Sequence, residues 1–156
     1  MSLDRAKKHL EAFGLDAKIR LFDVSSATVA LAAEAVGTEP KRIAKSLSFM
    51  QGDTPVLVIA AGDAKVDNRK YKDTFHTKAR MIGFDDVERL VGHAPGGVCP
   101  FGVNEGVKVY LDESLKRFDI VYPAAGTSQS AVELTFEELE RASCSLGWVD
   151  VCSIPE

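Results

Sequence analysis

The segment from residue 92 to 102 concentrates groups that could stabilise a developing negative charge. It reads Gly-His-Ala-Pro-Gly-Gly-Val-Cys-Pro-Phe-Gly, with four glycines and two prolines in eleven residues, a composition that excludes a helix or an interior strand. Glycines let a backbone approach a ligand closely, and successive N–H groups can point at an oxyanion or a phosphate. A purely structural connection is the alternative, although a connection of common length needs fewer glycines and prolines.

Lys45 is the second residue that could do chemistry. It lies in a predicted strand in which Ile43, Leu47 and Phe49 suggest one buried face, and strict alternation places Lys45 on that face. A lysine there costs free energy unless it is paired or opens on a cleft. Two interpretations stay open: a lysine facing a cleft, or an edge lysine whose ammonium reaches water along its aliphatic stem.

A run of small residues, 124–127 (Ala-Ala-Gly-Thr), follows a predicted strand and leaves room for a ligand. A hairpin turn would explain the same run equally well.

Conventional nucleophile arrangements have little support. His9 lies on a predicted helix and His76 in a basic stretch, so both are expected at the surface. His93 is the one histidine considered for catalysis, and Cys99 in the same segment could be a thiol nucleophile, but no sequence-local partner lowers its pKa. No Walker motif, GxGxxG fingerprint or metal-ligand cluster is present. A thiol-dependent hydrolase or redox protein using Cys99 is therefore only a third hypothesis.

The chemistry needs a scaffold, and 156 residues suffice for a single domain over residues 1–156 with a real core. The composition is ordinary for a soluble globular protein, and neither a membrane span nor a secretory signal is visible. Three cysteines without a CxxC motif argue against a disulfide framework or a zinc site. A reduced cytoplasm is the expected location.

Charge is unevenly distributed along the chain. The formal net charge is −4, yet residues 65–80 carry six basic and two acidic side chains, a net of +4. An acidic protein can therefore present one basic face to phosphates. A solvated charged helix with its flanks is the alternative.

Hydrophobic spacing and capping residues predict alternating helices and strands. Thr28 and Gly37 fit the start and stop of one helix, and Asp85/Glu88 and Thr135/Glu138 each fit a capping box. Strands 43–50 and 55–61 should form a central hairpin. The fold class predicted is mixed α/β (α+β), with a mixed or mostly antiparallel sheet. The expected helices are 3–13, 28–36, 68–75, 85–91 and 135–143, and the expected strands are 17–23, 43–50, 55–61, 78–82, 107–111, 118–122, 131–134 and 148–152.

These segments carry the motifs of a known family in its order and spacing. The chain resembles the YbaK/EbsC family, free-standing relatives of the editing domain inserted in bacterial prolyl-tRNA synthetase, from about residue 20 to the last strand. The matching residues are Thr28-x₃-Ala32-Ala33-x₃-Gly37, Ile43-x-Lys45-Ser46-Leu47, Gly92-x₃-Gly96-Gly97-Val98-x-Pro100-x-Gly102, Asp112, Ala125-Gly126 and the region from Glu133 to Leu139.

The resemblance implies a barrel-like sheet and hydrolysis of the ester of a mischarged, tRNA(Pro)-type aminoacyl-tRNA carrying a small non-cognate amino acid. Attack would come from a positioned water or the ribose 2′-hydroxyl, without cofactor or metal. Partners would be the 3′ aminoacyl-adenosine end and, as a further candidate, prolyl-tRNA synthetase, but no membrane. A non-catalytic tRNA- or synthetase-binding module of the same fold is the alternative.

The resemblance also implies roles for particular residues. Lys45 would hold phosphate or carbonyl oxygen, the loop amides would cradle the oxyanion, and Asp112 would mainly support the site. Ser46, Cys99 and the stretch 126–129 depart from common family patterns, which leaves the rejected amino acid open. The implied catalytic residues are Lys45, Gly96, Gly97, Val98, Cys99 and Pro100; the implied substrate-binding residues are Thr28, Ser46, His93, Phe101, Gly102, Asp112, Gly126 and Thr127.

Overall fold

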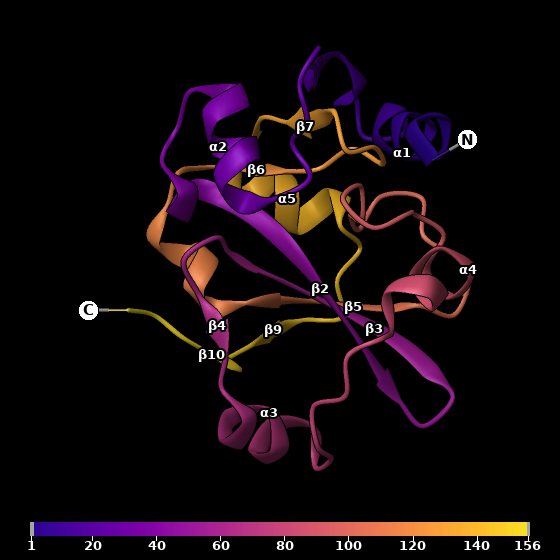
Figure 1. Cartoon of the computed structure of the whole chain (residues 1–156), viewed down its shortest axis with the longest axis vertical. Helices are drawn as coiled ribbons and strands as arrows, with labels where there is room; N and C mark the ends of the chain where they lie inside the picture. Colours follow the sequence, from indigo (N-terminus) through magenta and orange to yellow (C-terminus); the bar gives the residue numbers. More distant parts are fainter. Residues whose placement is uncertain (1, 156) are drawn as a thin grey trace.

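The computed structural model describes residues 2–155, and its centre is a mixed six-stranded sheet in the order β8-β6-β2-β3-β5-β9. The sheet curls into a half-barrel with helices around it (Figure 1), which confirms the predicted mixed α/β class with a barrel-like sheet. Its strands are β2 (Ile43–Gln51), β3 (Thr54–Ala61), β5 (Lys108–Asp112), β6 (Ile120–Pro123), β8 (Leu134–Thr135) and β9 (Trp148–Val149).

Two short ribbons complete the strand inventory of the described chain. β1 (Ile19–Leu21) pairs antiparallel with β7 (Ser130–Val132), and β4 (Lys65–Val66) pairs antiparallel with β10 (Cys152–Ser153). The first ribbon ties the segment that enters the second helix to the segment that leaves β6. These two segments therefore lie side by side although more than 100 residues separate them.

The β2–β3 hairpin is the longest element and crosses the whole molecule in Figure 1. Its strands pair antiparallel from Ala44↔Ala61 to Gln51↔Thr54. The two-residue connection uses Gly52 at φ 63°, a conformation that glycine adopts without a Cβ clash. Nearly all of β3 is buried, as its apolar sequence predicts for a strand covered on both faces.

Within residues 2–155, five helices surround the sheet, and the caps of α2 and α5 are those that the sequence predicts. The Thr28 hydroxyl accepts a hydrogen bond from the Leu31 N–H at 3.2 Å, and Gly37 ends the helix at φ 76°. Thr135 and Glu138 form both hydrogen bonds of the expected capping box. The helices are α1 (Ser2–Glu11), α2 (Val29–Val36), α3 (Asn68–Phe75), α4 (Val87–Val91) and α5 (Phe136–Ala142), with 3₁₀ turns η1 (Asp16–Lys18), η2 (Pro40–Arg42), η3 (Phe84–Asp86) and η4 (Glu113–Arg117).

Four local expectations were wrong. The strand expected at 78–82 is reduced to an isolated bridge between Phe49 and Met81, because only a few residues of this segment reach the edge of β2. No Asp85/Glu88 capping box forms, since η3 precedes α4 and Asp86 is the N-cap without a side-chain hydrogen bond. The strand expected at 131–134 divides into β7 and β8, which pair with β1 and β6 respectively. The expected last strand likewise divides into β9 and β10, which pair with different partners.

Within the described chain, none of the helices has the length and apolar character that a membrane crossing requires.

Candidate functional site

A cavity of about 330 Å³ lies between β2 and the glycine-rich segment. Its walls come from residues 26–32 at the start of α2, 43–48 of β2, 81–87 before and at the start of α4, 95–98 of the glycine-rich segment, and 122–131 between β6 and β7. The walls are therefore built from five separate parts of the chain, which the fold brings together.

The structure divides the predicted site residues into two groups. Thr28, Lys45, Ser46, Gly96 and Val98 line the cavity. The remaining predicted residues lie outside its lining: Gly97, Cys99, Pro100, His93, Phe101, Gly102, Asp112, Gly126 and Thr127. Several of these support the walls, as the contacts below show.

Lys45 is held by a turn that follows β3. Its ammonium group donates hydrogen bonds to the carbonyl oxygens of Gly62, at 3.3 Å, and of Ala64. Burial lowers the pKa of Lys45, and the nearby charge of Asp63 opposes that shift. Lys45 therefore lines the cavity while its ammonium group is fixed on the Gly62–Ala64 turn instead of extending freely into water.

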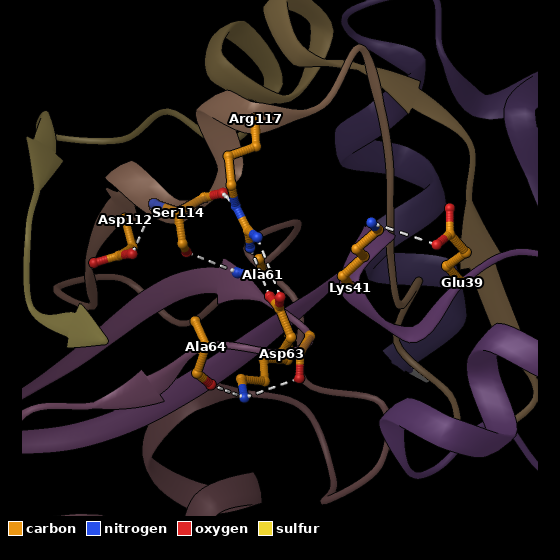
Figure 2. A network of polar contacts seen from close by, with 10 residues as sticks. Glu39, Lys41, Ala61, Asp63, Ala64, Asp112, Ser114 and Arg117 are labelled. Atoms are coloured by element: carbon orange, nitrogen blue, oxygen red, sulfur yellow. Dashed lines mark hydrogen bonds and ion pairs between the residues drawn. The ribbon is translucent and has the colours of Figure 1, made fainter. Parts of the chain in front are cut away.

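The turn is itself fixed by an ion pair from η4. The guanidinium of Arg117 donates to both carboxylate oxygens of Asp63, at 2.6 and 3.1 Å, and its Nε donates to the Ser114 carbonyl at 3.0 Å (Figure 2). The hydrogen bond from Arg117 keeps the pKa of Asp63 below its usual range. The Ser114 hydroxyl accepts from the Ala61 N–H at 3.0 Å, so η4 anchors both the end of β3 and the turn beyond it.

Asp112 supports this arrangement from behind. It is almost fully buried, and its carboxylate accepts hydrogen bonds from the N–H groups of Ser114 and Val151, both at 2.9 Å. The first bond caps η4, and the second ties the chain near its C-terminal end to the sheet. Asp112 thus has a structural environment and no access to the cavity.

The N-terminal helix clamps the glycine-rich segment at both ends. Arg5 of α1 donates to the Gly92 carbonyl at 3.1 Å and to the Asn104 side chain at 2.9 Å. His9 accepts from the Gly102 N–H at 3.0 Å through its Nδ1 atom. These contacts span more than 80 residues, so the amphipathic pattern of α1 gave no signal for them.

Gly97 and Gly126 lie back to back behind the cavity wall. A Cβ atom on Gly97 would come within 2.6 Å of the Gly126 carbonyl group and the Thr127 nitrogen. Gly126 has φ 95°, and a Cβ there would lie 2.5 Å from the Ser2 carbonyl oxygen. Both positions therefore require glycine, and the close contact fixes the glycine-rich segment against residues 124–127.

Cys99 and His93 lie together, although nothing in the local sequence predicts a reactive pair. The Cys99 sulfur is 3.6 Å from His93 Nε2, but Nε2 is also 2.6 Å from the Phe101 carbonyl oxygen. Since a carbonyl oxygen only accepts, Nε2 carries the proton and cannot remove one from the thiol. Burial raises the pKa of Cys99 to about 12 and lowers that of His93. A thiolate nucleophile at this position is disfavoured.

Two amide groups of the glycine-rich segment are available to a ligand. Gly96 and Val98 line the cavity, and within residues 2–155 neither N–H group has a hydrogen-bond partner. Gly97, between them, donates to the Ala94 carbonyl at 3.0 Å. These two unpaired N–H groups are the candidate donors of the segment to an oxygen atom in the cavity.

Ser130 is a site residue that the sequence did not reveal. It lines the cavity, and its hydroxyl accepts hydrogen bonds from the Ala125 N–H at 3.1 Å and the Thr127 N–H at 3.3 Å. It also donates to the Thr127 carbonyl at 3.0 Å. One buried serine thus shapes the turn over residues 124–127, and only the folded chain shows this role.

The lining of the cavity includes two exposed apolar side chains, and the chain segment that precedes them is basic. Met81 and Phe84 line the cavity yet remain 60% and 76% exposed. Within the described residues, only one of the six basic side chains of the 65–80 segment has a carboxylate within 4.0 Å, namely Lys70 with Asp150. The five basic side chains without such a partner are Lys65, Arg69, Lys72, Lys78 and Arg80.

Comparison with known proteins identifies a family, two relatives and a solved structure. The family model described as an aminoacyl-tRNA editing domain matches residues 24–142. The uncharacterized protein YwhH of Bacillus subtilis (strain 168) is 50% identical over 153 residues, covering 97% of this chain and 98% of YwhH. The proline–tRNA ligase of the same organism is 33% identical over 86 residues, 54% of this chain but only 15% of the ligase.

A solved structure shares the same fold over nearly the full length. A crystal structure described as a proposed trans-editing enzyme for prolyl tRNA synthetase superposes with a TM-score of 0.87 at 31% identity, covering 97% of both chains.

Proposed function

This chain belongs to the aminoacyl-tRNA editing domain family, and we propose that it hydrolyses the ester of a tRNA charged with the wrong small amino acid. The substrate class suggested is a tRNA(Pro)-type aminoacyl-tRNA, because the chain is related to proline–tRNA ligases and resembles a proposed trans-editing enzyme for prolyl tRNA synthetase.

One observation carries the proposal. The cavity is lined by Gly96 and Val98, whose N–H groups have no hydrogen-bond partner within residues 2–155, and by Lys45, whose ammonium group is held at the Gly62–Ala64 turn. Among the described lining residues there is no histidine, cysteine or carboxylate. This combination favours a reaction that needs stabilisation of negative charge more than it needs a protein nucleophile.

Hydrolysis of an aminoacyl ester is such a reaction. Water attacks the carbonyl carbon, with the neighbouring ribose hydroxyl available to orient it, and the carbonyl oxygen becomes an oxyanion. The oxyanion then collapses, the bond to the ribose oxygen breaks, and that oxygen takes up the proton lost by the attacking group. Each well-placed donor to the oxyanion contributes about 3 kcal/mol, and holding the reactants in place contributes further.

The mouth of the cavity fits the end of a nucleic acid strand. Unpaired bases stack on exposed aromatic rings, and their phosphates are attracted to basic side chains. Phe84 supplies the ring, while Lys78 and Arg80 precede it in the chain. The 3′ end would thus enter between Phe84 and the start of α2, with the ester at the Gly96–Val98 wall.

The experiment that tests this function is a panel of esters on one tRNA. The purified protein is incubated with tRNA(Pro) charged with proline, alanine, cysteine, serine or threonine, and loss of each ester is followed. We expect selective loss of one non-cognate ester. Survival of all five esters, with the tRNA still bound, would instead establish a non-catalytic binding module.

A further inference from the structure

The outer edge of β2 contains one position without a strand partner. Ser48 and Met50 bond to the segment after α3, since the Ser48 carbonyl accepts from the Ile82 N–H at 3.0 Å and the Met50 N–H donates to the Arg80 carbonyl at 2.9 Å. In an antiparallel pair, each residue directs its N–H and its C=O to the same edge of the strand, and successive residues alternate between the two edges. Even-numbered residues of β2 therefore direct N–H and C=O away from β3, and Ser46 is one of them.

Ser46 lacks a pairing segment because β6 pairs with β2 only before Ser46 and the segment after α3 pairs with β2 only beyond it. β6 pairs with β2 only as far as Ala44↔Pro123, and its chain then turns away through Gly126 at φ 95°. On the other side, the extended segment joins β2 only from Ser48 onward. The cavity lies against this interval, with Ser46, Ile82 and Ala124 all in its lining.

The side chain of Ser46 adds a second, independent observation. Its hydroxyl is buried and, within residues 2–155, has no hydrogen-bond partner. Three other hydroxyls of the lining are already used: Thr28 caps α2, the Ser26 hydroxyl bonds to the N–H and C=O of Ser130, and the Ser130 hydroxyl bonds to the backbone of Ala125 and Thr127. Ser46 therefore combines a buried hydroxyl without a partner and main-chain groups on an open stretch of the β2 edge.

We propose that the main chain of Ser46 pairs with the amino-acid part of the substrate, as a neighbouring strand residue would. An aminoacyl ester contains the same N–Cα–C=O unit as a residue in a chain. The Ser46 carbonyl would accept a hydrogen bond from the α-amine, and the Ser46 N–H would donate to the ester carbonyl, a one-residue form of strand addition. This inference rests on the proposed function of the same cavity.

The pairing defines a chemical class of ligand. Because no carboxylate lines the described cavity, a main-chain carbonyl is the acceptor available for an α-amine. Hydrogen bonds to the main chain do not depend on the amino-acid side chain. The specificity for one amino acid would therefore come only from contacts between its side chain and the cavity walls. Acyl groups without an α-amine should bind poorly.

The test uses stable amide-linked analogues, so that binding is measured separately from turnover. The full chain, labelled with ¹⁵N, is titrated with 3′-(L-alanylamino)-3′-deoxyadenosine and with its propionylamino counterpart, which lacks only the α-amine. We expect at least tenfold weaker binding of the propionyl compound, and the Ser46 amide resonance should shift as the alanyl compound saturates the protein. The Ser46→Ala variant keeps its main chain and should keep the same preference.

Three results would overturn the inference: equal binding of the two analogues, binding of neither, or loss of the preference in Ser46→Ala. The last result would show that the Ser46 hydroxyl, and not its main chain, recognises the α-amine. The proposed function is judged separately, by loss of mischarged esters. A chain that hydrolyses esters but binds both analogues equally retains its function and loses only the Ser46 pairing.

Discussion

Replacing Gly97 by alanine should impair catalysis while leaving the protein folded. The new Cβ would lie 2.6 Å from backbone atoms of Gly126 and Thr127. An ordinary contact needs at least about 3.4 Å, so the glycine-rich segment must move by roughly 0.8 Å (3.4 − 2.6), because no flexible side chain can yield. Over-packing of this size costs about 1–3 kcal/mol of stability.

The same displacement should reach the proposed oxyanion donors. The N–H groups of Gly96 and Val98 flank Gly97, and a donor must lie about 2.7–3.1 Å from the oxyanion to stabilise it. A shift of roughly 0.8 Å removes at least one such donor, which lowers kcat by about 10²–10³-fold. The assay is single-turnover deacylation of the susceptible mischarged tRNA, with the folded fraction measured by urea unfolding.

Gly83→Ala is the matched control, since its Cβ would meet only the Asp86 carboxylate, at 3.6 Å. It should retain near-normal kcat. The reasoning is refuted if folded Gly97→Ala protein keeps kcat within threefold of the wild type, or if Gly83→Ala loses as much activity.

Three further predictions follow from the site. Lys45→Ala should lower deacylation at least tenfold through loss of the charge beside the cavity, whereas Lys65→Ala, exposed and outside the lining, should not; equal rates for both variants would remove Lys45 from the site. Cys99→Ala should keep near-normal activity, because the thiol is buried and its pKa is raised to about 12; a hundredfold loss in folded protein would revive a thiol mechanism. Phe84→Ala should raise KM for mischarged tRNA about tenfold with little change in kcat, since stacking contributes about 1–3 kcal/mol per base; an unchanged KM would exclude a stacking role.

The sequence predicted those features that depend on neighbouring residues. The Thr28 and Thr135 caps and the β2–β3 hairpin are local, so spacing and residue type sufficed. The Asp85/Glu88 capping box does not form, although the two residues have the required spacing. Phe84 begins the 3₁₀ turn η3, so the α-helix does not start at Asp85.

The site was harder to predict because its geometry depends on long-range contacts. Lys45 could be selected as unusual, but the Gly62–Ala64 turn that holds it is positioned by Arg117, more than 50 residues away. The clamp from α1 to Gly102 spans 93 residues. Cys99 was recognisable as a candidate thiol. Only the fold shows that His93 lies beside it and that the His93 N–H donates to the Phe101 carbonyl, so His93 cannot act as a base for the thiol.

The most direct test of the central claim compares two esters on one tRNA. Wild-type protein in excess is mixed with tRNA(Pro) carrying either proline or the small non-cognate amino acid selected by the ester panel, and the first-order rate of ester loss is measured. The account predicts at least a hundredfold faster loss of the non-cognate ester than its spontaneous hydrolysis, with the prolyl ester spared. Rates equal to spontaneous hydrolysis for every ester would contradict the assignment of a deacylase.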